Sequence, residues 1–154
     1  SGGRGPGPQG AAAQNPESRF SNWVFTPHPG EAARLLSIDT AQVVSDPPGA
    51  AAEIAKRYGS VVLLKGAVSV VVSPEKGEWF VEGMNPALAT AGSGDVLTGV
   101  IGALLARGAS PRDAAIGGAL LHQEAGELLF EEAGWFAASA LPGAIGRVAG
   151  SLLY

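Results

Sequence analysis

The apolar segment Val61–Leu64 constrains the fold more than any other part of this 154-residue chain. Four consecutive aliphatic residues are typical of a strand that is buried on both faces, as the strands of a parallel sheet are. Such a strand needs helices above and below the sheet, and strand-like and helix-like segments do alternate along the chain. The sequence therefore predicts an α/β protein with a mostly parallel sheet.

Cap and turn residues divide the rest of the chain into further elements. Asp46 and Pro47 are typical of a helix start, and Gly59 is typical of a helix end. Residues 74–77 have the composition of a hairpin turn. The expected elements are a short buried strand at 22–25, helices at 29–36, 47–58, 93–107 and 111–133, hairpin strands at 68–73 and 78–81, and a last helix that begins near residue 141.

Residues 1–21 are expected to form a flexible segment ahead of a single domain at 22–154, because they are rich in glycine, proline and alanine. Residues 1–14 contain none of the hydrophobic run that a signal peptide needs. The longest apolar run, 96–106, is shorter than the roughly 20 residues that span a bilayer. We therefore expect neither a secretion signal nor a membrane anchor.

The bulk composition narrows the classes of partner and of site. A net charge of −4 argues against nucleic-acid binding, which needs a basic face. The chain has no cysteine, which excludes disulfides and thiolate metal sites and fits the reducing cytoplasm. With only two histidines, far apart in the sequence, a zinc site has little support. We expect a cytoplasmic protein whose partner is a small molecule and whose side chains form no metal site.

A glycine-rich turn, Ala91-Gly-Ser-Gly-Asp95, runs directly into a helix. Glycine lets a ligand approach the backbone, and a helix N-terminus offers free amides at the positive end of its dipole. Gly92, Ser93 and Gly94 are therefore predicted to cradle an anion such as a phosphate. Asp95 beside that anion is a candidate base for an attacking hydroxyl. The alternative is a tight turn whose acid is stabilised by the helix dipole.

Two further residues are candidates for ligand contacts. Lys65 follows the buried strand, from where a lysine reaches a nucleotide phosphate as a point charge, and Gly66 lets the next amides turn inward. The alternative for Lys65 is a solvated side chain that leaves the sheet. His28 stands between two prolines, and a rigid loop of this kind aims the imidazole at a substrate. The alternative for His28 is a surface turn.

The segments around His28, Lys65 and Asp95 each follow a strand-like segment. Ligands of open α/β sheets bind outside the carboxyl ends of the strands, so we expect these three residues to meet at one edge. Ser93 is not a candidate nucleophile, because the sequence places no histidine to activate it. His122 is expected to be a packing or hydrogen-bonding residue.

Together these segments resemble the C-terminal half of the ADP/ATP-dependent NAD(P)H-hydrate dehydratases, a ribokinase-like family. The resemblance runs in the expected order from about residue 22 to the C-terminus. It rests on Thr26-Pro-His-Pro-Gly-Glu31, Val62-Leu-Leu-Lys-Gly-Ala-Val-Ser69, Asn85-Pro-Ala-Leu-Ala-Thr-Ala-Gly-Ser-Gly-Asp-Val-Leu-Thr-Gly99 and His122-Gln-Glu-Ala-Gly126. It implies a three-layer sandwich that lacks the N-terminal half of the family domain, since residues 1–21 are too few for several strands.

Members of this family repair NADH or NADPH whose nicotinamide ring has gained water. The resemblance implies that ADP or ATP, with Mg²⁺, activates the ring hydroxyl and that elimination restores the cofactor, with AMP and phosphate as the products from ADP. It assigns His28 to the hydrated dinucleotide, and it makes Asp95 both a contact of that substrate and the base. The residues that it assigns to the adenine nucleotide are Lys65, Gly66, Ala67, Val68, Ser69 and Gly94.

Two other functions stay open at this point. A ribokinase-like kinase of a vitamin-precursor alcohol also has a Gly-x-Gly-Asp turn at a helix start, although the motifs at Thr26 and Lys65 favour the dehydratase. The other is an inactive nucleotide-binding fragment that needs a partner chain, because half of the family domain is absent. A half-built sheet exposes an edge strand and apolar surface, so a homo-oligomer is expected.

Overall fold

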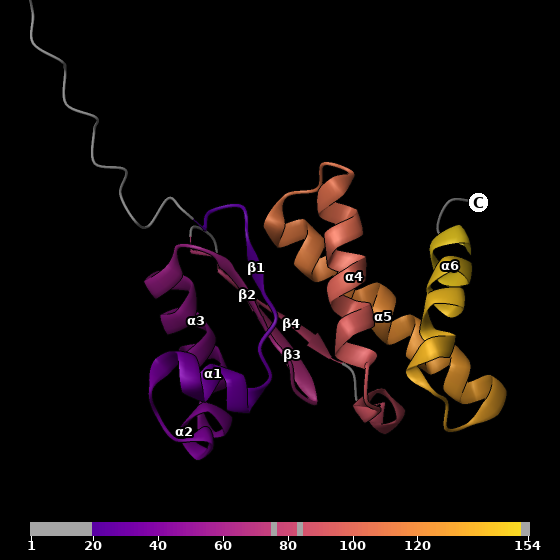
Figure 1. Cartoon of the computed structure of the whole chain (residues 1–154), viewed down its shortest axis with the longest axis horizontal. Coiled ribbons are helices and arrows are strands. Elements are labelled where there is room, and N and C mark those ends of the chain that lie inside the picture. Colours follow the sequence, from indigo (N-terminus) through magenta and orange to yellow (C-terminus); the bar gives the residue numbers. More distant parts are fainter. Residues whose placement is uncertain (1–19, 75–76, 83–84, 152–154) are drawn as a thin grey trace, which may run out of the picture.

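The computed structural model describes residues 20–74, 77–82 and 85–151. Most of the segment expected to be flexible and the centre of the hairpin turn therefore lie outside the described residues. The described elements are β1 (Val24–Phe25), α1 (Pro29–Leu36), α2 (Thr40–Ser45), α3 (Pro47–Tyr58), β2 (Val61–Leu64), β3 (Val68–Val72), β4 (Glu78–Glu82), η2 (Pro86–Ala89), α4 (Ser93–Ala106), α5 (Pro111–Ala133), η3 (Ala138–Ala140) and α6 (Leu141–Ser151) (Figure 1).

The four strands form one sheet in the order β1-β2-β3-β4. The α/β class is confirmed, but the expectation of a mostly parallel sheet is wrong for the described strands. Only β1 and β2 are parallel, and β2–β3 is an antiparallel pair. The antiparallel pair β3–β4 is the hairpin that the sequence predicts, so that expectation is confirmed. The reason is the length of the links: residues 65–67 join β2 to β3 and residues 73–77 join β3 to β4. A parallel crossover needs a dozen or more residues, so these short links force the chain to reverse.

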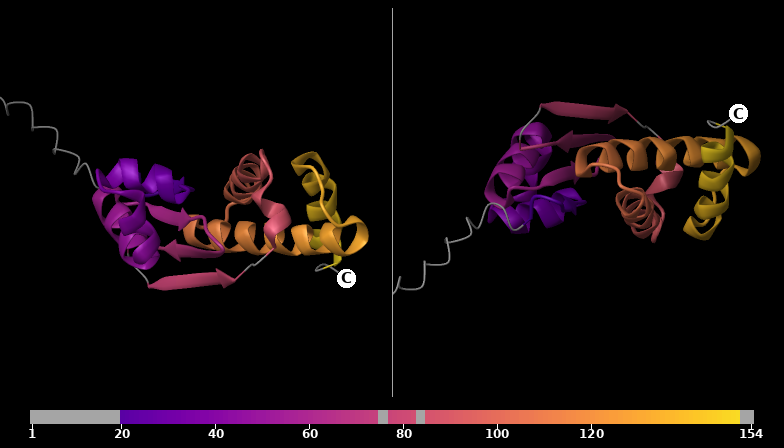
Figure 2. Two further views of the ribbon diagram at one scale, coloured as in Figure 1. Left: turned by 90° about the horizontal axis from the view of Figure 1, so that it is seen from below. Right: turned by 90° about the horizontal axis from the view of Figure 1, so that it is seen from above.

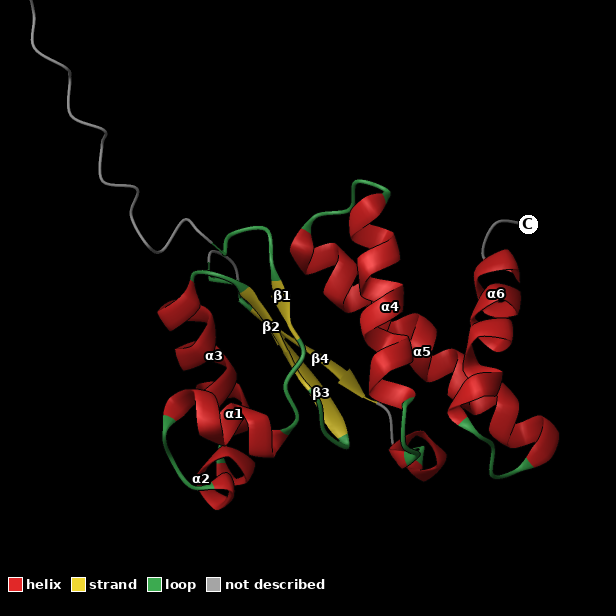
Figure 3. Ribbon diagram, in the orientation of Figure 1, coloured by secondary structure: helices red, strands yellow, loops and turns green. Residues whose placement is uncertain are grey.

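Helices cover both faces of the sheet, which gives three layers (Figures 2 and 3). Side chains alternate across a strand, so Val62 and Leu64 of β2 pack against α1 and α3 on one face. Val61 and Leu63 pack against α4 and α5 on the other face. All four β2 residues are buried, as the sequence predicts. By contrast, β1 was expected to be buried and is only half-buried, because it has a described neighbour on one side only.

A third cluster of buried residues lies where α5 continues past the sheet and packs against α6. Figure 1 shows α6 beside the far part of α5, away from the strands. The approach of α4 to α5 depends on Gly118, because a Cβ there would lie 2.6 Å from Cγ1 of Ile101. The described part of the chain contains no helix that is long and apolar enough to cross a membrane.

The helix caps agree with the sequence, with one element missed. Asp46 accepts a hydrogen bond from the Gly49 amide at 3.0 Å, and Gly59 ends α3 with a left-handed φ of 61°. The short helix α2 was not predicted. Only Val43 in its six residues is buried, so it lacks the periodic apolar face that marks a helix.

Candidate functional site

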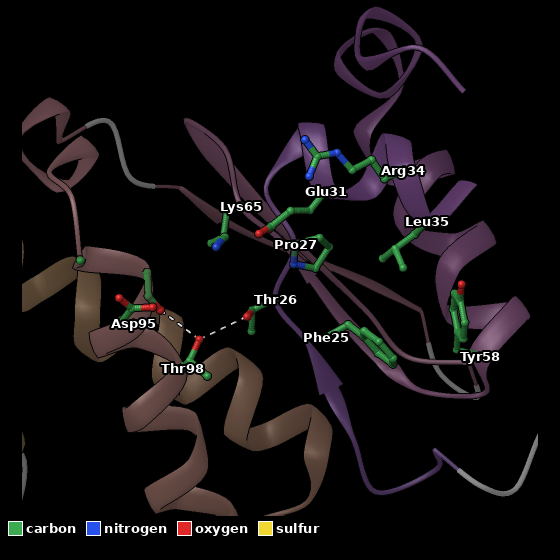
Figure 4. Close-up of a pocket in the computed structure, with 12 residues that line it drawn as sticks. Phe25, Thr26, Pro27, Glu31, Arg34, Leu35, Tyr58, Lys65, Asp95 and Thr98 are labelled. Carbon is green, nitrogen blue, oxygen red and sulfur yellow. Dashed lines mark hydrogen bonds between the residues drawn. The ribbon is translucent and has the colours of Figure 1, made fainter. Parts of the chain in front are cut away.

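The candidate site lies beyond the carboxyl ends of the parallel strands β1 and β2. The Lys65 amide, directly after β2, donates to the carbonyl of Pro27 at 2.9 Å, which joins the two loops. The Oγ1 atoms of Thr26 and Thr98 lie 3.3 Å apart, and this contact connects the loop after β1 to α4 (Figure 4). The expected convergence of the segments around His28, Lys65 and Asp95 is therefore confirmed.

Lys65 stands over the first turn of α4. Its Nζ atom lies 3.2 Å from the point where a Cβ on Gly94 would be. Among the described residues, the Gly94 amide has no hydrogen-bond acceptor, whereas the amides of Ser93 and Asp95 donate to the carbonyls of Thr90 and Gly92. An ammonium group and an unpaired N–H thus meet at the positive end of a helix, which suits an anion.

Gly92 keeps this end of α4 open. It is the N-cap residue, with a left-handed φ of 88°, and it has no side chain that could occupy the amides of the first turn. Serine or aspartate at this position would cap the helix and fill the space that a ligand needs. The backbone therefore leaves the anion position free of the chain's own groups.

Asp95 is exposed on the first turn of α4 and lines a cavity of about 740 Å³. Thr98, one turn further along, donates from Oγ1 to the carbonyl of Gly94 at 2.9 Å and lines the same cavity. We call it the Asp95 cavity; its lining also includes Phe25, Thr26, Pro27, Glu31, Arg34, Tyr58, Lys65, Gly92 and Gly94 (Figure 4).

A second cavity, of about 560 Å³, begins on the other side of Lys65 and Gly94, which line both. We call it the His122 cavity; its lining includes His28, Gly66, Ala67, Ser69, Asn85, Ser93, His122 and Gln123. Val68 lines neither cavity, and its side chain is exposed on β3. Two spaces for ligand groups therefore meet at Lys65 and Gly94.

His28 has a structural role that the sequence did not indicate. Its Nδ1 atom accepts hydrogen bonds from the amides of Gly30 at 3.1 Å and Glu31 at 3.3 Å. The Glu31 carboxylate in turn accepts from the His28 amide at 2.8 Å, which completes a capping box. The hydrogen bond from the His28 amide is the main reason that the pKa of Glu31 is lowered. Nearby positive charges act in the same direction, and burial opposes them. The imidazole is half exposed and also lines the His122 cavity.

Ser93 and His122 meet in the interior, contrary to the expectation that no histidine lies near Ser93. The His122 Nε2 atom lies 3.0 Å from both the Oγ and the carbonyl oxygen of Ser93. Both residues are buried. Burial lowers the pKa of His122, although the hydrogen bond with Ser93 opposes this shift. The hydrogen-bonding role expected for His122 is confirmed, and the Ser93 side chain points to this histidine.

Several lining residues were missed from the sequence. Arg34 lies one helical turn after Glu31 in α1, so the spacing of three residues placed both on one face and could have revealed it. Thr98 follows Asp95 at the same spacing in α4. Phe25 and Tyr58 have ring centroids 5.3 Å apart in the wall of the Asp95 cavity. Nothing in the sequence pairs these two residues, because different elements carry them.

The arrangement can hold a phosphate and place a carboxylate next to it. Lys65 and the Gly94 amide supply the positive end, and Asp95 follows Gly94 directly in the chain. In residues 20–74, 77–82 and 85–151, no three histidine or carboxylate side chains gather where they could hold a metal ion. A magnesium ion that is carried mainly by substrate phosphates needs only one or two carboxylates, and Asp95 suits that arrangement.

Comparison with known proteins places this chain in a family. The family model described as NAD(P)H-hydrate dehydratase matches residues 10–146. The ADP-dependent (S)-NAD(P)H-hydrate dehydratase of Neisseria meningitidis serogroup B is 45% identical over 139 residues, which cover 90% of this chain and 47% of that protein. This chain therefore spans about half the length of that relative.

Solved structures agree with this result. The Bacillus subtilis ADP/ATP-dependent NAD(P)H-hydrate dehydratase, co-crystallized with ATP and Mg²⁺, is 30% identical with a TM-score of 0.69, over 80% of this chain and 47% of that one. A ribokinase-like superfamily protein from Enterococcus faecalis is 29% identical with a TM-score of 0.65, over 80% of this chain and 44% of that one. The ribokinase-like fold is confirmed, and the chain belongs to the NAD(P)H-hydrate dehydratase family.

Proposed function

We propose that this chain carries the nucleotide site and the catalytic base of an ADP-dependent dehydratase that repairs hydrated NADH and NADPH. The observation that carries this proposal is the position of Lys65 and Gly94 on the border of two cavities, with Asp95 in one of them. A phosphoryl group held at that border is within reach of ligands on both sides. Membership of the family and the relatives named above support the same reaction.

The proposed chemistry uses few protein groups. Asp95 takes the proton from the hydroxyl of the hydrated nicotinamide ring, and the hydroxyl oxygen attacks the terminal phosphorus of ADP. The bond from that phosphorus to the bridging oxygen breaks, and AMP leaves. Loss of the new phosphate ester from the ring, together with a ring proton, restores NAD(P)H and releases phosphate. Lys65 and the Gly94 amide would stabilise the charge on the transferred group.

The other ligand contacts follow from the same proposal. The adenine nucleotide, as ADP or ATP, takes the side of the border with Gly66, Ala67 and Ser69. Val68, between Ala67 and Ser69 in the chain, would contribute its backbone only, because its side chain lines neither cavity. Gly92, Ser93 and Gly94 form the turn that cradles its phosphate. Mg²⁺ bound to those phosphates would neutralise part of their charge, as is usual in phosphoryl transfer. By the same family resemblance, His28 would contact the hydrated dinucleotide, although its ring lines the cavity that is proposed here for the adenine nucleotide.

We further propose a cytoplasmic protein that self-associates and binds no nucleic acid. Its negative charge argues against nucleic acid, and its lack of cysteine fits the cytoplasm. Self-association is supported by β1, which lies at an edge of the described sheet and is preceded by Trp23, which is 55% exposed. A measurement of mass in solution tests the association. A monomer at all concentrations would contradict it.

The test of function is recovery of NADH absorbance from hydrated NADH with ADP or ATP and Mg²⁺. We expect Asp95→Asn to slow recovery roughly 10²- to 10⁴-fold while ADP binding is retained. Asp113→Asn is the matched control, since Asp113 is the first-turn acid of α5. Full activity of Asp95→Asn would rule out Asp95 as the base. ADP binding without recovery in the unaltered chain would favour an inactive fragment that needs a partner chain.

A further inference from the structure

The contact between Ser93 and His122 involves an atom next to the candidate anion position. Nε2 of His122 lies 3.0 Å from the carbonyl oxygen of Ser93, and this oxygen belongs to the same peptide unit as the N–H of Gly94. A peptide unit is planar and trans, so its C=O and N–H point in opposite directions. An imidazole that holds the carbonyl from one side therefore fixes the direction in which the Gly94 N–H points.

The chemistry of the two atoms decides the tautomer of His122. A carbonyl oxygen only accepts hydrogen bonds, so Nε2 must carry the proton that it donates to Ser93. The Ser93 hydroxyl, at the same distance, shares this donor through its oxygen lone pairs. Burial favours the neutral ring, which leaves Nδ1 without a proton. The geometry thus assigns a neutral imidazole protonated at Nε2.

A hydrogen bond to a carbonyl also strengthens the N–H of the same peptide unit as a donor, because chains of hydrogen bonds polarise one another. The Gly94 N–H has no acceptor among the described residues, so this gain is available to a ligand. The interaction spans two helices, since Ser93 is the first residue of α4 and His122 lies in the middle of α5.

We propose that His122 is a positioning residue for the anion site, which aims and polarises the Gly94 N–H through the carbonyl of Ser93. The identity of the anion as a nucleotide phosphate rests on the proposed function. The competing interpretation is a core contact that merely ties α5 to α4. The two differ in one respect: a positioning residue affects phosphate binding selectively, whereas a core contact affects the fold and all ligands alike.

The variants that separate these interpretations are His122→Leu and His122→Gln. Leucine fills the space without a donor, whereas the Nε2 amide of glutamine replaces the donor of the ring. Glu124→Gln is the control, because Glu124 is exposed on the same helix and lines neither of the two cavities.

Calorimetry with ADP and with adenosine is the first measurement. We expect His122→Leu to weaken ADP binding roughly 3- to 12-fold, the loss of one hydrogen bond, with adenosine affinity unchanged and His122→Gln close to wild type. Equal loss for ADP and adenosine, or unchanged ADP affinity in a folded His122→Leu protein, would overturn the proposal.

A second measurement needs neither nucleotide nor activity, and it decides the proposal even if the proposed function fails. In the ligand-free protein, the Gly94 amide resonance should move in His122→Leu and return in His122→Gln, while Ile101 in the middle of α4 stays unchanged. In the wild type, ring nitrogen shifts should show His122 protonated at Nε2; the chain has only two histidines to assign. Protonation at Nδ1, or an unmoved Gly94 amide, would contradict the positioning role.

Discussion

Two helices begin at this site, and their N-termini differ in how their backbone amides are satisfied. At α1, the His28 ring accepts from the amides of Gly30 and Glu31, and the Glu31 carboxylate accepts from the amide of His28. At α4, a glycine stands at the cap position and the Gly94 amide has no acceptor among the described residues. The first N-terminus satisfies its own donors, whereas the second leaves a donor for something else.

This difference separates a structural helix start from the proposed anion site. The start of α1 follows β1 and the start of α4 follows the 3₁₀ helix η2, but both carry an acid in the first turn, so a sequence pattern based on that acid treats them alike. What distinguishes them is the lysine over α4 and the absence of a capping side chain. The following changes test this distinction, in order of decreasing effect.

The largest effect is expected from Lys65→Met, which keeps most of the unbranched side chain and removes its charge. Loss of a charge-assisted contact should weaken ADP binding roughly 10- to 150-fold, with a small change in the free energy of unfolding. Calorimetry and denaturant unfolding measure the two quantities. Lys56→Met serves as the control, because Lys56 is exposed on α3. Unchanged ADP affinity would mean that no phosphate binds near Lys65.

Gly94→Ala places a methyl group in the anion position. In the ligand-free protein the nearest atom is the flexible Lys65 Nζ at 3.2 Å, so the fold should tolerate alanine. Crowding of the phosphate should weaken ADP binding roughly 5- to 150-fold. Gly99→Ala is the matched control, because a Cβ there meets nothing within 4 Å. A stable Gly94→Ala protein with wild-type affinity would show that the amide lies outside the site.

The contrasting prediction concerns the cap of α1. His28→Ala removes the acceptor of the Gly30 and Glu31 amides and should cost about 1 kcal/mol in the free energy of unfolding. His28→Asn provides another capping oxygen and should retain most of that stability. If His28 also contacts the substrate, His28→Asn lowers activity without lowering stability. Equal stability of the alanine and asparagine variants would argue against the cap.

The smallest effects concern the pH dependence of stability. The folded state lowers the pKa of His122 below its usual 6.5, so the unfolded chain binds more protons near that pH. Stability should therefore be complete above pH 6.5 and fall as the pH falls below it. The lowered pKa of Glu31 adds a second loss below its usual value of 4.5. His122→Gln should flatten the first slope and Glu31→Gln the second; unchanged slopes would contradict these assignments.

The elements of the fold could be predicted where caps and apolar runs are local. Asp46 and Gly59 mark helix boundaries that the structure reproduces. The direction of β3 was missed because the parallel pattern of β2 was extended to its neighbours, although three linking residues exclude a crossover. Burial of one strand indicates that helices cover both faces of the sheet, but it does not indicate the direction of the next strand.

The site could be predicted only in part, for a related reason. Glycines and an acid at a helix start, and a lysine at a strand end, indicated an anion position, and the structure brings these residues together. The cap of α1 by His28 was missed, since a histidine cap has no common sequence signature. The pair of Ser93 and His122 was missed because the two residues are 29 positions apart and meet only when α4 packs on α5.

The length of α5 has a consequence for local unfolding of the protein. Its 23 residues extend about 34 Å, so its first half belongs to the sheet core and its second half to the cluster with α6. The helix α4 rests on both, through Leu97 on the sheet side and Val96 on the side of α6. Local unfolding of α6 therefore removes one support of the turn that carries Asp95. A nucleotide bound at Gly94 should slow hydrogen exchange in α6, although α6 lines neither cavity.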